Sequence, residues 1–328
     1  MRQRLLVLIL ASTLLALTPI QAGFETAEAS PVAASAAVSA SASPDPRLVR
    51  KFYARKGSEA WKAAKRDSRF NAIGKTPMAQ WMSEGWFPIR TVRKQTKRYV
   101  QAAAKAHKTP VIAVYAIPAR DCGGYSSGGF SPKAYRTWIT KMARGLRGSR
   151  AMVILEPDAL GHLGNCPGQG DRTGLLKFAT KKLSKAGAWV YIDAAHTGWV
   201  KPSQMAARLA RSGIGRARGF SVNVASFVRT DIEKRYAKRI LKALRKRGIR
   251  NVHYVMDTSR NGGGAKDGNN WCNPLDARLG RKPQVIGRKH LDAYLWVKAP
   301  GESDGYCNGG PAAGQWWDDY ALRLMGRR

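Results

Sequence analysis

Short apolar runs recur along the chain, and each ends in polar or ionisable residues. The clearest run begins at Ala151 and leads directly into Glu156, Pro157 and Asp158 (AMVILEPDALGH). A strand buried on both faces is apolar throughout, so only its end can carry carboxylates. Five further runs have this form, and we expect strands at residues 111–117, 188–192, 220–224, 252–256 and 293–297.

Between these runs the apolar positions follow helical spacing. Alternating strands and helices predict a parallel sheet with helices outside, and in a barrel the polar strand ends gather at one face. The glycine-rich stretch 123–129 lacks GxGxxG order and a Walker lysine, which disfavours a nucleotide site. We therefore predict an α/β barrel with its active site at the C-terminal ends of the strands. The expected helices are residues 48–68, 89–107, 132–146, 173–186, 204–212 and 231–247.

The first 46 residues depart from this pattern. Arg2 and Arg4 precede an apolar segment at 5–17, and small residues follow near Ala22. This order is typical of a secretory signal peptide, and the segment is too short to span a bilayer comfortably. The next stretch is rich in Ala, Ser and Pro, which is typical of a flexible linker. We predict a signal peptide at 1–22, a linker at 23–46 and a barrel domain at 47–328, secreted and without a later membrane span.

The chain has four cysteines, at positions 122, 166, 272 and 307. In an exported protein this number predicts two disulfides, because oxidising compartments let them persist. Four cysteines allow three pairings, and spacing alone does not choose among them. No two are spaced as CxxC, which disfavours a zinc site.

Basic residues greatly outnumber acidic ones: 57 Lys and Arg against 21 Asp and Glu give a net charge of +36. Such an excess fits nucleic acid, an anionic envelope polymer or an acidic substrate as partner. In stretches such as 234–250 the charges alternate with apolar residues at helical spacing, which favours a solvated helix face over a dedicated binding stripe. Weak electrostatic association with an anionic cell wall is compatible with this pattern. No nucleic-acid motif is present, so we expect no nucleic-acid partner.

Carboxylates collect at the predicted strand ends. Several carboxylates in one cleft raise one another's pKa, so that one of them keeps its proton near neutrality. Such a set serves either metal binding or acid and base catalysis, and only His162 and His196 lie near it. We therefore favour acid and base chemistry, with Asp193 in a supporting role, and expect no metal or other cofactor. The set comprises Asp121, Glu156, Asp158, Asp193, Asp257, Glu302 and Asp304.

Aromatic residues alternate with these acids, and the chain contains ten tryptophans. Indole rings beside carboxylates suit sugars, because C–H faces stack on the rings while hydroxyls bond to the acids. Trp199 and Trp271 follow strand ends and are expected in the cleft. Trp296 lies inside an apolar strand and is expected in the core.

Six sequence blocks resemble, in order, the signature blocks of glycoside hydrolase family 6, the inverting β-1,4-glucanases. The resemblance extends from about Trp81 to the C-terminus. It implies a distorted (β/α) barrel of about seven parallel strands, with disulfides Cys122–Cys166 and Cys272–Cys307. The blocks are VYAIPARDCGGYSSGG (114–129), VILEPDALGHL (153–163), YIDAAHTGW (191–199), MDTSRNG (256–262), NWCNP (270–274) and LWVKAPGESDG (295–305).

The resemblance also implies roles for individual residues. Asp158 matches the general acid, and Asp121 matches the aspartate that supports its proton and the water network. Asp304 matches the proposed base, a disputed role because the proton can leave through a water chain. Tyr115 matches a tyrosine beneath the scissile ring, and Trp81 matches a further stacking tryptophan. The remaining sugar-binding matches are His196, Trp199, Asn223, Trp271, Lys298 and Glu302.

Two departures from the family pattern bear on how a glucan would be attacked. Val200, Lys201 and Pro202 replace a stretch where some members carry a second tryptophan, which implies a weaker distal subsite. The segments 274–291 and 302–317 are short, which favours an open groove and endo attack by a secreted, monomeric β-1,4-glucanase. The alternatives are an exo-acting cellobiohydrolase of the same family and a non-catalytic protein that binds envelope polysaccharide.

Overall fold

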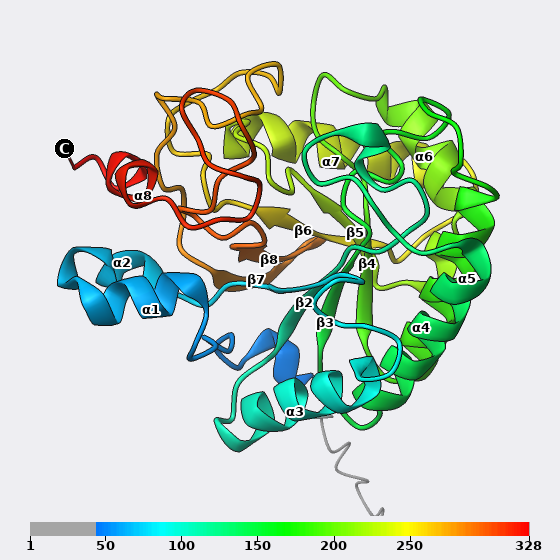
Figure 1. Ribbon diagram of the computed structural model, residues 1–328. Coiled ribbons are helices and arrows are strands. Elements are labelled where there is room, and N and C mark those ends of the chain that lie inside the picture. The colour runs from blue at the N-terminus through cyan, green and yellow to red at the C-terminus, as the bar shows by residue number, and fades with distance from the viewer. Residues whose placement is uncertain (1–43, 328) are drawn as a thin grey trace, which may run out of the picture. The chain divides into compact units, whose positions relative to one another are not determined.

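Eight strands form one sheet, and seven of them are parallel (Figure 1). The computed structural model describes residues 44–327. The strands are β1 (Gln80–Met82), β2 (Val111–Val114), β3 (Met152–Leu155), β4 (Trp189–Asp193), β5 (Gly219–Val222), β6 (His253–Asp257), β7 (Gln284–Arg288) and β8 (Leu291–Leu295). Their order is β1-β2-β3-β4-β5-β6-β8-β7, and β7 pairs antiparallel with β8 at the edge.

The sheet curls into an incomplete barrel. Strands β1 and β8 form no ladder, yet the backbone N–H of Ala79 donates to the carbonyl of Trp296 at 2.9 Å. The indole N–H of Trp81 donates to the carbonyl of Val297 at 2.7 Å. These two bonds join the first strand to the end of β8 just below the polar face.

Both faces of the strands are buried, which explains why the runs are apolar without alternation. Met152 and Ile154 point into the barrel, whereas Val153 and Leu155 pack outward against the helices. Each such side chain contributes about 1.5–3 kcal/mol when fully buried. The barrel interior is therefore a packed core, and only the strand ends remain available for chemistry.

The helices cover the outside of the barrel (Figure 1). Helices α3 to α7 follow one another around the sheet, while α1, α2 and α8 pack with Trp296 beside the β1–β8 junction. Side-chain oxygens of Ser58, Ser131 and Asp171 cap the N-termini of α1, α4 and α5. The helices are α1 (Glu59–Arg66), α2 (Asn71–Gly74), α3 (Val92–Lys105), α4 (Pro132–Leu146), α5 (Arg172–Lys185), α6 (Pro202–Arg211), α7 (Thr230–Arg245) and α8 (Asp318–Leu324).

Most predicted elements are confirmed. All six predicted strands are present with shifted ends, Trp296 is only 2% exposed, and the disulfides join Cys122 to Cys166 and Cys272 to Cys307. The fold is the expected distorted barrel with seven parallel strands, and the antiparallel β7 is an addition. None of the helices within residues 44–327 combines the length and apolarity needed to cross a bilayer.

Other secondary-structure predictions were wrong or incomplete. The helix expected at 48–68 begins only at Glu59, because Phe52 bridges to Thr109 and Gly57 adopts a φ of +84°. Strands β1 and β7 were not predicted, since β1 has three residues and neither strand is fully buried. The short helices α2 and α8 were not predicted either. The expected signal peptide at 1–22 and most of the linker at 23–46 lie outside the described residues.

Candidate active site

A groove of about 1680 Å³ runs across the C-terminal ends of the strands. Asn223 does not line it: the side chain is fully buried, and its amide donates to the carbonyls of Val228 and Asp257 at 3.1 and 3.0 Å. The structure therefore places Asn223 beneath the groove rather than on its surface. Ten of the predicted site residues do line the groove: Trp81, Tyr115, Asp121, Asp158, His196, Trp199, Trp271, Lys298, Glu302 and Asp304.

The turns that follow the strands are strained. Asp121, Glu156, Asp158, Ala195 and Asn223 all have φ between 51° and 67°, a region that residues with a side chain seldom occupy. Each such residue costs about 1–3 kcal/mol and persists only where its surroundings hold it. Strain that recurs at the ends of neighbouring strands marks this face as the functional one.

Buried carboxylates hold these turns in place. Glu156 at the end of β3 accepts the backbone N–H groups of Ala116 and Ile117, after β2, at 2.9 and 3.1 Å. Asp257 at the end of β6 accepts those of Ala225 and Lys298, after β5 and β8, at 3.1 and 3.0 Å. Each acid thus ties its own strand end to the loops of neighbouring strands. Neither acid lines the groove, so both are structural.

Asp193 has the same structural role and an electrostatic one. Its carboxylate accepts the N–H groups of Asp158 and Ala195, both at 3.0 Å, and the hydroxyl of Ser221 at 2.9 Å. Burial raises the pKa of Asp193 to about 7, although these donors oppose the shift by favouring the ionised form. The sequence placed Asp193 with the groove acids, but it is buried behind Asp158.

Asp158 is the groove carboxyl that keeps its proton. Burial raises its pKa well above the ordinary value, and the negative charges of Asp193, Asp121 and Asp304 raise it further. Ionising a buried carboxyl beside other negative charges is unfavourable, so Asp158 retains its proton near neutrality. Asp158 is therefore equipped to donate a proton to a molecule in the groove.

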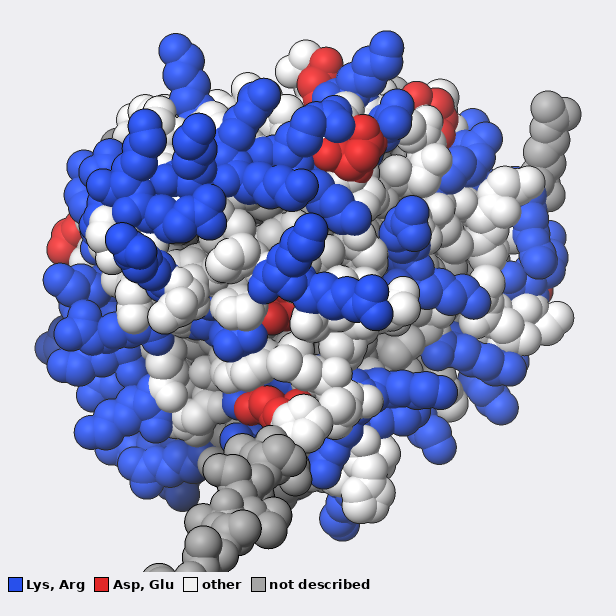
Figure 2. Space-filling model, turned by 180° about the vertical axis from the view of Figure 1, so that it is seen from behind, with Lys and Arg blue, Asp and Glu red and all other residues white. Residues whose placement is uncertain are grey.

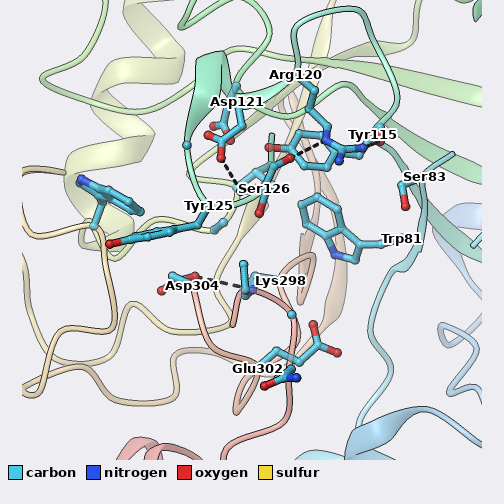
Figure 3. Close-up of a pocket in the computed structure, with 18 of the residues that line it drawn as sticks. Trp81, Ser83, Tyr115, Arg120, Asp121, Tyr125, Ser126, Lys298, Glu302 and Asp304 are labelled. Atoms are coloured by element: carbon cyan, nitrogen blue, oxygen red, sulfur yellow. Dashed lines mark hydrogen bonds and ion pairs between the residues drawn. The ribbon is translucent and has the colours of Figure 1, made fainter. Parts of the chain in front are cut away.

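The loop that carries Asp121 is held by Arg120 (Figure 3). The guanidinium donates to the carbonyls of Tyr115 and Ser126 at 2.8 and 2.7 Å and pairs with Glu84 at 2.6 Å. The Asp121 carboxylate accepts the N–H of Ser126 at 2.7 Å. Asp121 is thus oriented as an acceptor on the same groove surface as Asp158.

Asp304 is ionised, in contrast to Asp158. Burial alone would raise its pKa, but the charges of Arg260 and Lys298 overcome this and lower it. Arg260 donates to Asp304 at 2.7 Å, the N–H of Asn273 does so at 3.1 Å, and the Lys298 ammonium lies 3.6 Å away. Sequence reasoning did not identify Arg260, although it lies in a polar stretch directly after β6.

Aromatic rings form the walls of the groove. Trp81 meets Tyr115 edge to face at 5.2 Å, and Trp199 lies between His162 and His196 with centroids 4.7 and 5.3 Å away. Burial lowers the pKa of His196, so this ring is neutral. Its Nδ1 lies 2.9 Å from the Thr197 carbonyl, which requires a proton on Nδ1 and leaves Nε2 free to accept a hydroxyl.

The geometry thus unites a protonated acid, two further carboxylates and stacking rings in one groove. Residues 43–328 match the sequence profile described as Glycosyl hydrolases family 6. The chain belongs to this family and is a glycoside hydrolase.

Individual relatives agree with this assignment. Endoglucanase A of Cellulomonas fimi is 44% identical over 271 residues, which cover 82% of this chain but 58% of that protein. Endoglucanase 1 of Streptomyces halstedii is 37% identical over 310 residues, covering 90% and 94%. The endoglucanase Cel6 from Mycobacterium tuberculosis, solved with a methyl-cellobiosyl-4-deoxy-4-thio-β-D-cellobioside, aligns with a TM-score of 0.80 and 41% identity, covering 86% of this chain and 98% of that one.

Replacing Asp193 tests how the proton of Asp158 is kept. In Asp193→Asn the neighbouring negative charge is gone, so the pKa of Asp158 falls and the acid loses its proton at lower pH. We expect the alkaline limb of the kcat/KM profile to move about one pH unit toward acid.

Asp257→Asn is the matched control, because Asp257 is an equally buried acid at a strand end that accepts backbone N–H groups. Both variants lose about 1–3 kcal/mol of stability by placing an amide against N–H donors. Only Asp193→Asn should move the alkaline limb. Equal shifts in the two variants would contradict the electrostatic role.

Proposed function

We propose that this family 6 enzyme hydrolyses β-1,4-glucan with inversion, with Asp158 as the general acid. The observation that carries the proposal is the half-buried Asp158 carboxyl, whose pKa is raised well above its ordinary value, lining a groove beside indole and phenol rings. The endoglucanase names of its relatives, and the thio-cellobioside in the M. tuberculosis structure, support a β-1,4-glucan as the substrate.

The reaction follows from the two contrasting aspartates. Asp158 gives its proton to the glycosidic oxygen while the bond from that oxygen to C1 breaks. A water molecule attacks C1 from the opposite face, and its proton passes toward Asp304 directly or through a second water. The lowered pKa of Asp304 makes it a weak base, which favours transfer through water and leaves Asp121 to orient the water network.

The sugar contacts complete the proposal. Trp81, Trp199 and Trp271 offer stacking surfaces, and Tyr115 lies beside the acid centre. Burial raises the pKa of Glu302, which lines the groove near Lys298. Asn223, expected to touch sugar, is better placed to hold the turn after β5.

The general acid is tested by Asp158→Asn, which keeps the shape of the side chain and removes the donated proton. We expect turnover of unactivated glucan to fall about 10³-fold, while binding of cello-oligosaccharides persists. Reducing-sugar release and isothermal titration measure the two quantities.

Near-normal turnover in Asp158→Asn would refute the assignment. In the unaltered enzyme, NMR of freshly released product should show the α-anomer first. Early appearance of the β-anomer would instead mean retention of configuration.

Endo attack is the mode we propose, because the segments 274–291 and 302–317 are short. An endo enzyme cuts inside chains, so the viscosity of carboxymethylcellulose should fall steeply while few reducing ends appear. Viscometry and reducing-sugar assays on the same samples measure this ratio. Release of cellobiose without an early fall in viscosity would favour the exo alternative.

We also propose that the enzyme acts outside the cell and associates with anionic wall polymer. Helices α3, α4, α5 and α6 are adjacent and contain no aspartate or glutamate. Figure 2 shows a face on which Lys and Arg side chains are dense and acidic ones sparse. On α5, Lys177, Lys181 and Lys185 repeat at i,i+4 spacing, where like charges destabilise a helix. A polyanion would relieve this repulsion.

Neutralising that row tests the association. The triple substitution Lys177→Gln, Lys181→Gln and Lys185→Gln should weaken binding to isolated anionic cell walls about tenfold at low salt. Hydrolysis of a soluble neutral glucan should not change, because these side chains lie on an outer helix.

The matched control is the replacement of Lys282, Arg288 and Lys289, also exposed, on the β7 side. It removes the same charge but leaves the acid-free helices intact, so it should weaken wall binding less. Wall binding that is indifferent to ionic strength, or equal losses in the two variants, would contradict a specific basic surface.

A further inference from the structure

One side chain crosses the groove. Tyr125 projects from the loop after β2, and its hydroxyl donates to the backbone carbonyl of Tyr306 at 3.2 Å. Tyr306 belongs to the loop after β8, on the opposite wall. Figure 3 shows the Tyr125 ring between Asp121 on one loop and Asp304 on the other. The groove, expected to be open because the segments 274–291 and 302–317 are short, is thus bridged beside its catalytic carboxylates.

The loop after β8 accommodates the Tyr125 ring at Gly305. A Cβ atom at Gly305 would overlap the Tyr125 ring, and Gly305 has a φ of +144°, which favours glycine. Trp271 and Tyr306 flank the ring, each with a centroid distance of 6.2 Å. The Tyr125 ring therefore packs closely against the backbone of Gly305, directly after Asp304.

The loops on both walls are restrained by disulfides and hydrogen bonds. The Cys122–Cys166 disulfide and the Arg120 bonds hold the first loop. On the second loop, Cys272 is joined to Cys307, and the Asn273 amide donates to the carbonyls of Gly305 and Cys307 at 3.0 and 3.1 Å.

The bridging side chain itself is held weakly. Tyr125 is 49% exposed, and its seat includes Trp271 and Tyr306, which are 53% and 71% exposed. Within residues 44–327 the side chain makes one neutral hydrogen bond at the surface and partial contacts with two rings. Rotation about its Cα–Cβ bond would clear the groove without moving either backbone.

We propose that Tyr125 is a side-chain gate that sets how glucan enters, an inference that rests on the proposed function of the groove. With the gate seated on Gly305, a chain is enclosed beside Asp304 and must enter by its end. With the ring rotated away, an internal segment can enter from the side. The balance between endo and exo attack then depends on the gate.

The gate is tested by comparing Tyr125→Ala with Tyr306→Ala. The first variant removes the side chain that bridges the groove, so internal cuts become more frequent. The loss of carboxymethylcellulose viscosity per reducing end formed should rise about fivefold, because the closed state then loses one neutral hydrogen bond worth about 1 kcal/mol. The second removes an exposed ring but keeps the carbonyl that accepts from Tyr125, so the ratio should change less than twofold. An unchanged ratio in Tyr125→Ala, or equal changes in both variants, would overturn the gate.

Binding without hydrolysis separates the gate from the proposed reaction. In the Asp158→Asn background, a cello-oligosaccharide with bulky groups at both ends can enter only from the side. Its association rate, followed by tryptophan fluorescence, should rise about fivefold on adding Tyr125→Ala, while that of the unblocked oligosaccharide changes less. Equal acceleration of both ligands would refute the gate, whereas failure of the unaltered enzyme to bind or cut any β-1,4-glucan would refute the proposed function.

Discussion

The active face depends on buried carboxylates that accept backbone N–H groups at the ends of the strands. Parallel strands leave unpaired N–H groups where they end, and an unpaired buried donor costs about 1–3 kcal/mol. Glu156, Asp193 and Asp257 each supply the missing acceptor to a neighbouring loop. Because these bonds also hold turns with positive φ, they fix the positions of the residues that face the groove.

Burial of these acids also determines the chemistry. Burial and the negative charge of Asp193 behind it raise the pKa of Asp158, while Arg260 and Lys298 lower that of Asp304. Two carboxyls in one groove are thus driven to opposite protonation states by their surroundings, as an acid and its counterpart require. The protonation state of each aspartate is therefore determined by the side chains around it and not by its residue type.

The sequence predicted the acids and the strands because both are local signals. Asp158 follows its own strand by three residues, and α4 covers the predicted 132–146. What the sequence could not show were partners distant along the chain, such as Arg260 beside Asp304, 44 residues away. The burial of Asn223 beneath the groove was not visible for a related reason: its position depends on a turn with positive φ, which composition does not reveal.

Loop length is the signal most readily over-interpreted. The short segments 274–291 and 302–317 indicated an open groove, and that inference assumed that backbone must cover a glucan. Here Tyr125 reaches a carbonyl 181 residues away in sequence, and Gly305 accommodates the ring. Enclosure therefore depends on one side chain between two disulfide-bonded loops, and such a contact can form and break more readily than a loop can fold over the groove.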